Sequence, residues 1–339
     1  MTWTEPGAFP VAPGVHRIPL PLPQDGLRAV NVYALETADG LVLVDGGWAV
    51  PAAREVLDAG LAQLGATVHD VRRFLVTHVH RDHYTQAVVV RRETGAQVGL
   101  GAGERPTVEL LQDTSRGPLD GQVVQLRRVG AHALADATAR VVRARAHQLT
   151  DDWESPDVWL EPGELELPGG RVLEAVHTPG HTAGHLVFAD DEAGLLFAGD
   201  HVLPTITPSI GFEPVLTPDP LGAFLRSLAL VRARPDALLL PAHGEVAPSV
   251  HARVDELVAH HGRRLDVAQA AAEGTGRCAA DVAEVLLWTR RGRAFSELDG
   301  FNQMLAVFET GAHLDLLAAQ GRLVREEVPE HDTLVLRYR

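Results

Sequence analysis

Hydrophobic positions along the first hundred residues follow two periods, one typical of β-strands and the other typical of α-helices. Residues 30–35 and 41–45 predict two strands, and the Asp-Gly pair between them is a strong signal for a hairpin turn. Residues 53–64 carry apolar side chains at the spacing of one helical face. An apolar strand follows at residues 74–76, and this alternation of strands and helices predicts an α/β fold.

The strand pattern continues to about residue 250 and then stops. A second hairpin is predicted within residues 165–176, and a helix follows Asp219-Pro220, with Asp219 as its N-cap. Beyond residue 250 the pattern predicts one long helix, short helices and a two-stranded wing, at residues 250–273, 279–288, 301–308, 309–320, 323–325 and 334–337. We therefore expect a first domain at residues 1–250 and a second at residues 251–339.

Residues 101–152 are less regular than the rest of the first domain. Arg140, Arg143 and Arg145 lie among apolar residues there, in a segment that reads as an amphipathic helix. This segment fits a cap insertion that shapes a substrate pocket. It fits a solvated helix face or a homodimer contact equally well, and the sequence leaves these alternatives open.

Composition restricts the class of protein. The chain has 339 residues, of which 45% are hydrophobic and 22% charged, as in soluble globular proteins. We expect a cytoplasmic protein, because no membrane-spanning run or secretory leader is visible and Cys278 is the single cysteine. The net charge of −15 argues against nucleic-acid binding, and the absence of Lys excludes lysine Schiff-base chemistry.

The strongest chemical signal comes directly after the strand at residues 74–76. His78, His80, Asp82 and His83 fall within six residues. Imidazole nitrogens and carboxylate oxygens are ligands for zinc and its neighbours among the metals. Packing four such groups at the end of a buried strand is unfavourable unless a cation lies beside them. The pattern therefore predicts a metal site.

Three later strands end in residues of the same kind. The strand at residues 172–176 leads into a His-Thr-Pro-Gly-His segment that contains His181, the strand at residues 195–199 leads into Asp200, and a third strand leads into His243. Strands hold such ligands rigidly, while the loops that follow leave a metal open to substrate.

Taken in order, His-x-His-x-Asp-His, Thr-Pro-Gly-His-Thr, Gly-Asp and Ala-His-Gly resemble the motifs of the metallo-β-lactamase-fold hydrolases. The resemblance covers roughly residues 14–250 and implies an αββα sandwich. Residues 251–339 resemble the winged-helix extension of the β-lactamase-like-protein-2 branch, especially at residues 309–314. Because acidic residues outnumber arginines in this helical, winged-helix-like domain, we expect it to be structural or to cap the substrate.

The resemblance also implies a complete dinuclear centre. Two divalent metal ions would be bound, with Zn²⁺ expected first and Fe or Mn as alternatives. A hydroxide bridging the metals would attack the substrate, and Asp82 would also act catalytically by steering that hydroxide. The implied ligands are His78, His80 and His181 for the first metal, Asp82, His83 and His243 for the second, and Asp200 as the bridge.

Four further residues lie close to these motifs. Asp45 matches a family position where it would support a ligand, and its alternative is a turn residue. Tyr84 either assists a carbonyl or simply packs. His177 is expected to be structural or to support a ligand, and His201 either lines the pocket or orients a ligand.

Other histidines are not expected to bind a metal. His185 begins an apolar strand and is predicted to be a hydrogen-bonded core residue. His260 and His261 lie in a polar helical stretch and are predicted to occupy a solvated face.

The function that these residues favour is hydrolysis of a small acyl substrate, namely a thioester, an ester or a lactone. A metal-dependent endoribonuclease of the same superfamily is the first alternative, and the acidic charge balance argues against it. A non-enzymatic winged-helix binding protein with a vestigial metal site is the second, and the intact ligand set argues against that.

Overall fold

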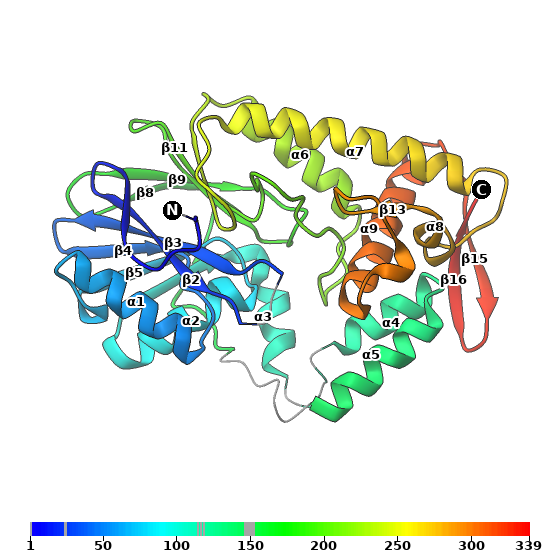
Figure 1. Cartoon of the computed structure of the whole chain (residues 1–339), viewed down its shortest axis with the longest axis horizontal. Coiled ribbons are helices and arrows are strands. Elements are labelled where there is room, and N and C mark those ends of the chain that lie inside the picture. The colour runs from blue at the N-terminus through cyan, green and yellow to red at the C-terminus, as the bar shows by residue number, and fades with distance from the viewer. Residues whose placement is uncertain (1, 24–25, 114, 116, 118, 146–152) are drawn as a thin grey trace. The chain divides into compact units, whose positions relative to one another are not determined.

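A computed structural model describes residues 2–23, 26–113, 115, 117, 119–145 and 153–339 of the chain (Figure 1). Those residues belong to two compact units. The first unit consists of Met1–Gln112, Asp151–Pro208 and Ser227–Asp255, and the second of Asp113–Thr150, Ser209–Arg226 and Glu256–Arg339. Each unit is described separately below.

The first unit contains a seven-stranded sheet in which neighbouring strands follow the order of the sequence. Its first four strands pair antiparallel, and β3 and β4 form the hairpin predicted from the Asp-Gly pair. The remaining pairs, from β4 to β7, are parallel. The strands are β1 (Phe9–Ala12), β2 (Val15–Pro21), β3 (Ala29–Thr37), β4 (Gly40–Val44), β5 (Val71–Val76), β6 (Gln97–Gly101) and β7 (Val158–Leu160).

Two helices pack against one face of this sheet, α1 (Pro51–Gln63) and α2 (Arg81–Thr94). Leu57 and Leu61 of α1 and Val88 of α2 are fully buried in one apolar cluster with the sheet. Helix α2 begins before the predicted start near residue 85, because its polar first turn has no apolar periodicity that could reveal it. A shorter helix, α3 (Arg105–Gln112), follows β6.

A five-stranded sheet faces the other side of the first sheet. Tyr33 of the first sheet and Phe197 of the second meet edge to face, with ring centroids 5.4 Å apart, inside an apolar cluster drawn from both sheets. Every residue of the central strands β10 and β11 is buried, so both faces of this sheet are covered. Its order is β12 (Leu238–Pro241), β11 (Leu195–Gly199), β10 (Leu186–Asp190), β9 (Val172–His177) and β8 (Gly163–Glu166).

Parallel pairing brings distant polar residues to the same sheet edges. β4 and β5 are parallel, so Asp45 and Thr77, which follow their last residues, lie beside each other. β11 and β12 are also parallel, with Gly199 opposite Pro241, so Asp200 and His243 both lie just past this pair. The topology therefore gathers at strand ends the segments that the sequence marks as chemically active.

The second unit is mainly helical and ends in the hairpin of β15 and β16. The two helices predicted at residues 301–308 and 309–320 form a single helix, α9, because almost all of its middle is buried and the amphipathic period is therefore weak. Asp299 caps α9 by accepting a hydrogen bond from Asn302 N. The elements are α4 (Asp120–Arg128), α5 (His132–Arg145), α8 (Ala279–Val285), β13 (Leu287–Trp288), β14 (Arg293–Ala294), α9 (Gly300–Ala319), β15 (Arg325–Glu330) and β16 (Thr333–Tyr338).

Helices α6 (Pro220–Arg232) and α7 (Val250–Ala272) each contribute residues to both units. Asp219 caps α6 as predicted, since its carboxylate accepts a hydrogen bond from Gly222 N. Helix α5 covers the arginine-rich stretch of the predicted cap insertion, and residues 146–152 of that insertion lie outside the described residues.

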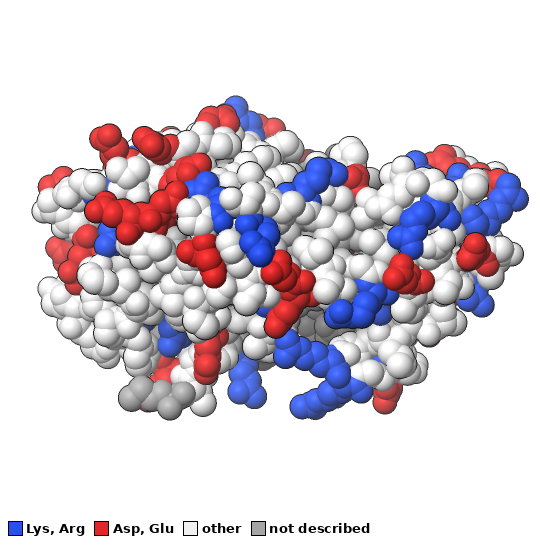
Figure 2. All heavy atoms as spheres, turned by 90° about the horizontal axis from the view of Figure 1, so that it is seen from above, with Lys and Arg blue, Asp and Glu red and all other residues white. Residues whose placement is uncertain are grey.

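Charged residues of both signs are interspersed over the face shown in Figure 2. Among the helices of the described part, none combines the length and apolar character needed to cross a membrane.

Candidate metal centre

The turn from β5 into α2 carries four of the predicted ligands. His80 is the N-cap residue of α2, so His78 and His80 precede the helix while Asp82 and His83 lie in its first turn. The His83 N–H donates to the His80 carbonyl at 3.0 Å, which fixes this tight turn. A strand joined so directly to a helix directs several polar side chains to one place.

His78, His80 and His181 bring three ring nitrogens together. His80 Nδ1 lies 2.9 Å from His78 Nε2 and 3.0 Å from His181 Nε2. A neutral imidazole has one N–H and one lone pair, so three nitrogens at one point cannot all be satisfied by one another. This first histidine group therefore fits a cation bound by nitrogen.

Asp82, His83 and His243 form a second group. Asp82 Oδ2 lies 3.7 Å from His83 Nε2 and 3.4 Å from His243 Nε2. Both of these ring nitrogens are buried and have no hydrogen-bond partner among the described residues. Buried polar atoms are rarely left unpaired, so this pair also fits a bound cation.

Asp200 lies between the two groups and presents one oxygen to each. Its Oδ1 is 3.4 Å from His243 Nε2 and 3.7 Å from His83 Nε2, and its Oδ2 is 3.5 Å from His181 Nε2. Oδ1 is also buried without a hydrogen-bond partner among the described residues. A carboxylate in this position fits a bridge between two cations.

Hydrogen bonds on the far side of each ring set the nitrogen that points inward. His243 Nδ1 donates to the Ala29 carbonyl at 2.7 Å, and His83 Nδ1 lies 2.9 Å from Asp45 Oδ2. His78 Nδ1 lies 3.1 Å from the Thr77 hydroxyl, which itself donates to Asp45. These contacts direct the Nε2 atoms of the three rings towards the centre.

Burial lowers the pKa values of the histidines in the site, whereas neighbouring carboxylates raise them. Burial lowers the pKa of His80 to about 3 and holds the pKa of His78 well below its usual value, so both rings are neutral. Burial opposes protonation of His83 as well, yet the carboxylates of Asp45, Asp82 and Asp200 raise its pKa to about 10. The second group is therefore strongly attractive to positive charge.

Both carboxylates of the centre remain ionised. Burial alone would raise the pKa of Asp82, but His83 and His243 hold it below its ordinary value. The pKa of Asp200 is lowered in the same way, by His243, His83 and His181 against the effect of burial. Ionised carboxylates can bind a divalent metal directly, whereas the His83 ring, with its raised pKa, would release a proton when a metal binds.

The other predicted residues occupy different places around this centre. Tyr84 is buried, and its hydroxyl donates to the Glu154 carbonyl at 2.6 Å. His177 is exposed, with Nε2 2.8 Å from the Ala183 carbonyl. His201 is fully buried, and burial lowers its pKa to about 3.

His185 is a buried, hydrogen-bonded residue, as predicted. Its Nδ1 lies 2.9 Å from the Thr178 hydroxyl, and its Nε2 accepts a hydrogen bond from Asp200 N at 3.2 Å. The support that it gives to Asp200 was not predicted. Nor was the part played by Thr77, and its position directly after an apolar strand is the only signal the sequence contains.

The solvated position predicted for His261 is wrong. This ring is fully buried in the second unit, where Nδ1 lies 3.2 Å from His313 Nε2 and the ring packs against Phe224. His260 is partly buried. The error arises because His313 and Phe224 lie far from His261 in the sequence, so a polar helical stretch gives no sign of them.

Comparison with known proteins places this geometry in a family context. The family model described as Metallo-beta-lactamase superfamily matches residues 25–243. The crystal structure of a metallo-beta-lactamase family protein from Thermus thermophilus is 29% identical, with a TM-score of 0.77, and the match covers 97% of this chain and 99% of that one. Its fold therefore extends over nearly the whole chain described here.

Curated relatives are more distant. A lactamase-like protein of Pestalotiopsis fici is 24% identical over 238 residues, covering 70% of this chain and 58% of that protein. A protein of Emericella nidulans named atrochrysone carboxyl ACP thioesterase is 24% identical over 254 residues, covering 75% of this chain and 63% of that protein. This chain thus spans less than two-thirds of the length of either relative.

Proposed function

Since the chain belongs to the Metallo-beta-lactamase superfamily, we propose that it is a dinuclear metal-dependent hydrolase of small acyl substrates. The observation that carries this proposal is the position of Asp200, whose two oxygens face two separate groups of histidines. A single-metal or vestigial site would have no need of a second set of buried, unpaired ligand atoms.

Seven residues would hold the two ions. Two bound divalent ions supply a water molecule of lowered pKa and polarise the acyl carbonyl. The mixture of imidazole and carboxylate donors, with no thiolate, suits zinc first and also suits iron or manganese. The proposed ligands are His78, His80, His181, Asp82, His83, His243 and Asp200.

Asp82 has a second part in this proposal. Its carboxylate is ionised and lies at the edge of the second group, where it accepts a hydrogen bond and so orients the attacking water. Asp45 and Thr77 contribute by fixing the rings of His83 and His78. None of these roles requires a further catalytic side chain.

We favour thioesters within the acyl class. The support is the name of the Emericella nidulans relative, an acyl-carrier thioesterase, although only part of that protein is matched. Esters and lactones present the same electrophilic carbonyl and remain within the proposal. Residues 1–250 would perform this reaction in the cytoplasm, and the winged-helix-like residues 251–339 would have a structural or substrate-capping role. The segment at residues 101–152 would either shape the substrate pocket or form a homodimer contact.

The test is a measurement of metal content and of hydrolysis on one metal-loaded preparation. We expect about two ions per chain and hydrolysis of acyl-coenzyme A thioesters, with lactones, β-lactams and RNA as comparison substrates. His80→Ala and Asp200→Ala should each abolish hydrolysis. His69→Ala, which alters an exposed histidine outside the site, is the control. Full activity in either site variant would refute the proposal.

A further inference from the structure

A buried amide next to the proposed centre has no place in the mechanism above. Asn31 lies in β3, is fully buried, and is not one of the predicted site residues. Its side-chain Nδ2 donates to the carbonyls of Pro241 and Gly244, both at 2.9 Å. Its backbone N–H donates to the Ala242 carbonyl at 2.7 Å. These three hydrogen bonds hold the chain on both sides of His243.

The orientation of the Asn31 amide is set from its other end. Arg17 Nη1 donates to Asn31 Oδ1 at 3.0 Å, and a guanidinium can only donate hydrogen bonds. The amide oxygen must therefore face Arg17, which leaves both N–H groups directed at the two carbonyls. The reverse orientation would place an amide N–H₂ against a guanidinium and an oxygen against two carbonyl oxygens.

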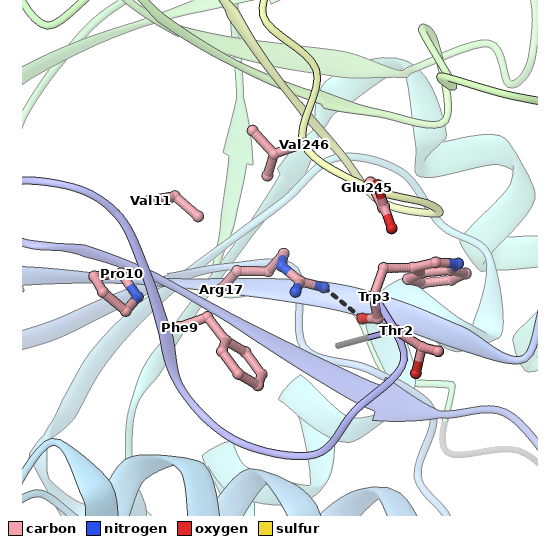
Figure 3. Close-up of a pocket in the computed structure, with 8 residues that line it drawn as sticks. All are labelled: Thr2, Trp3, Phe9, Pro10, Val11, Arg17, Glu245 and Val246. Carbon is pink, nitrogen blue, oxygen red and sulfur yellow. Dashed lines mark hydrogen bonds between the residues drawn. The ribbon is translucent and has the colours of Figure 1, made fainter.

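Arg17 is itself held in place. Its Nη1 also donates to the Trp3 carbonyl at 2.6 Å, and its guanidinium lies 5.3 Å from the centre of the Phe9 ring. Figure 3 shows Arg17 pointing towards Trp3, with Glu245 above the guanidinium and Phe9 below it. These residues line a pocket of about 280 Å³. Burial lowers the pKa of Arg17, and nearby Tyr33 and Glu245 oppose that change. The side chain is thus a fixed donor.

From these contacts we infer that Asn31 is a positioning residue for His243, with Arg17 as its anchor. The inference rests on the proposed function, because it assigns His243 to a metal. Asn31 holds the backbone of the His243 segment, and the Ala29 carbonyl in the same strand receives Nδ1 of the ring. Strand β3 therefore fixes both the position of the His243 backbone and the rotation of the His243 ring.

Of the two ions, only the second should require Asn31 for tight binding. His243 belongs to the group with Asp82 and His83, whereas the first histidine group is held by other strands. Changes in residues that orient a ligand typically weaken metal binding by about 10–100-fold. Loss of the Asn31 amide should therefore lower the affinity for one of the two ions by that factor and leave the affinity for the other unchanged.

Asn31→Asp is the sharpest variant, because the carboxylate still accepts a hydrogen bond from Arg17 but presents oxygen to two carbonyl oxygens. Gln122→Glu is the matched control, since Gln122 is another buried amide that donates to a backbone carbonyl, that of Phe212, in the second unit. Zn²⁺ binding is measured by competition with a chelator, and Co²⁺ absorption spectra report the ligand set of each ion.

We expect Asn31→Asp to bind one ion as the wild type does and the other about 10–100-fold more weakly, with an altered Co²⁺ spectrum. Gln122→Glu should keep both affinities at their wild-type values, because Gln122 contacts none of the proposed ligands. If Asn31→Asp does not fold, Arg17→Met tests the same contacts from Arg17 through Asn31 to the His243 segment. It should lower the affinity for the same ion.

Wild-type affinity for both ions in the folded Asn31→Asp or Arg17→Met variant would overturn the inference. A wild-type protein that binds fewer than two ions would instead contradict the proposed function. The two failures are therefore separate, and neither measurement depends on knowing the substrate.

Discussion

Asp45 and His83 are joined by a hydrogen bond of 2.9 Å between Oδ2 and Nδ1. The other carboxylate oxygen of Asp45 accepts hydrogen bonds from the backbone N–H and the hydroxyl of Thr77, at 2.8 and 2.9 Å. Thr77 in turn contacts the ring of His78. One buried carboxylate thus supports a histidine in each of the two groups, although it is not itself a proposed ligand.

Replacing Asp45 with Asn should weaken metal binding about 10–100-fold, because a single amide oxygen cannot serve both Thr77 and His83. The backbone at Asp45 has φ 63°, a conformation that Asn also adopts, so the change acts on hydrogen bonding rather than on the backbone. Chelator competition measures the effect. Asp70→Asn, at a half-buried capping carboxylate outside the centre, should leave the affinity unchanged. Unchanged affinity in Asp45→Asn would contradict this role.

A methyl group at Gly199 should destabilise the protein beyond the backbone effect alone. The added Cβ would lie 2.7 Å from His185 Nε2 and 2.8 Å from Thr77 Oγ1, so both supports of the centre must shift. Gly194 has a similar positive φ but nothing within 4 Å of its Cβ, which makes Gly194→Ala a matched control. In urea unfolding we expect Gly199→Ala to lose about 1–3 kcal/mol more than Gly194→Ala. Equal losses would show that the contacts with His185 and Thr77 are not restrictive.

The Tyr84→Phe variant should show whether Tyr84, the residue after His83, contributes to packing or to catalysis. The Tyr84 hydroxyl donates a hydrogen bond to the Glu154 carbonyl, and the Tyr84 ring stacks on Trp153, with ring centroids 6.2 Å apart. Loss of one buried hydrogen bond predicts about 1 kcal/mol lower stability. The value of kcat should stay within a factor of about three, as expected when no catalytic proton transfer is lost. A hundredfold fall in kcat would instead indicate that the hydroxyl assists the substrate carbonyl.

The histidine pair of the second unit should make stability depend on pH. Burial lowers the pKa of His261 to about 2 and that of His313 to about 4, both below the ordinary value of about 6.5. Below pH 6.5 the unfolded chain binds protons that the folded chain excludes, so stability falls as the pH drops from about 6.5 towards 4. The slope is about 1.4 kcal/mol per pH unit for each histidine.

Urea unfolding at several pH values tests this effect. His261→Leu should remove the contribution of one histidine and flatten the dependence between pH 6.5 and 4, whatever its effect on stability at pH 7. His69→Ala, at an exposed position, should leave the slope as it is in the wild type. An equally steep fall in His261→Leu would show that the buried pair does not cause it.

The sequence predicts the mixed α/β fold well because its strands are marked by apolar runs and its turns by Asp-Gly and Pro residues. Membership of the superfamily, predicted from the four motifs, is confirmed by the match over residues 25–243. The motifs can be recognised because each predicted ligand stands next to a strand end in the chain itself. Local spacing is enough to find such residues.

Interactions between distant segments explain what the sequence did not predict. Asn31 acts on carbonyl groups more than two hundred residues away, and the Ala29 carbonyl that receives His243 has no side-chain signal at all. The solvated position predicted for His261 is wrong for the same reason, since its partner His313 lies on another helix. Backbone acceptors and remote partners become visible only when the strands and helices are assembled.

The spread of the strand ends along the chain also determines when the centre can form during synthesis. The first proposed ligands follow β5, yet the last proposed ligand, His243, follows β12 and is held by contacts back to β3. A nascent chain that has left the ribosome only as far as Asp200 lacks this residue and the strand that carries it. If these residues bind metal as proposed, the second ion can be bound at full strength only after β12, and with it every strand of both sheets, has been translated.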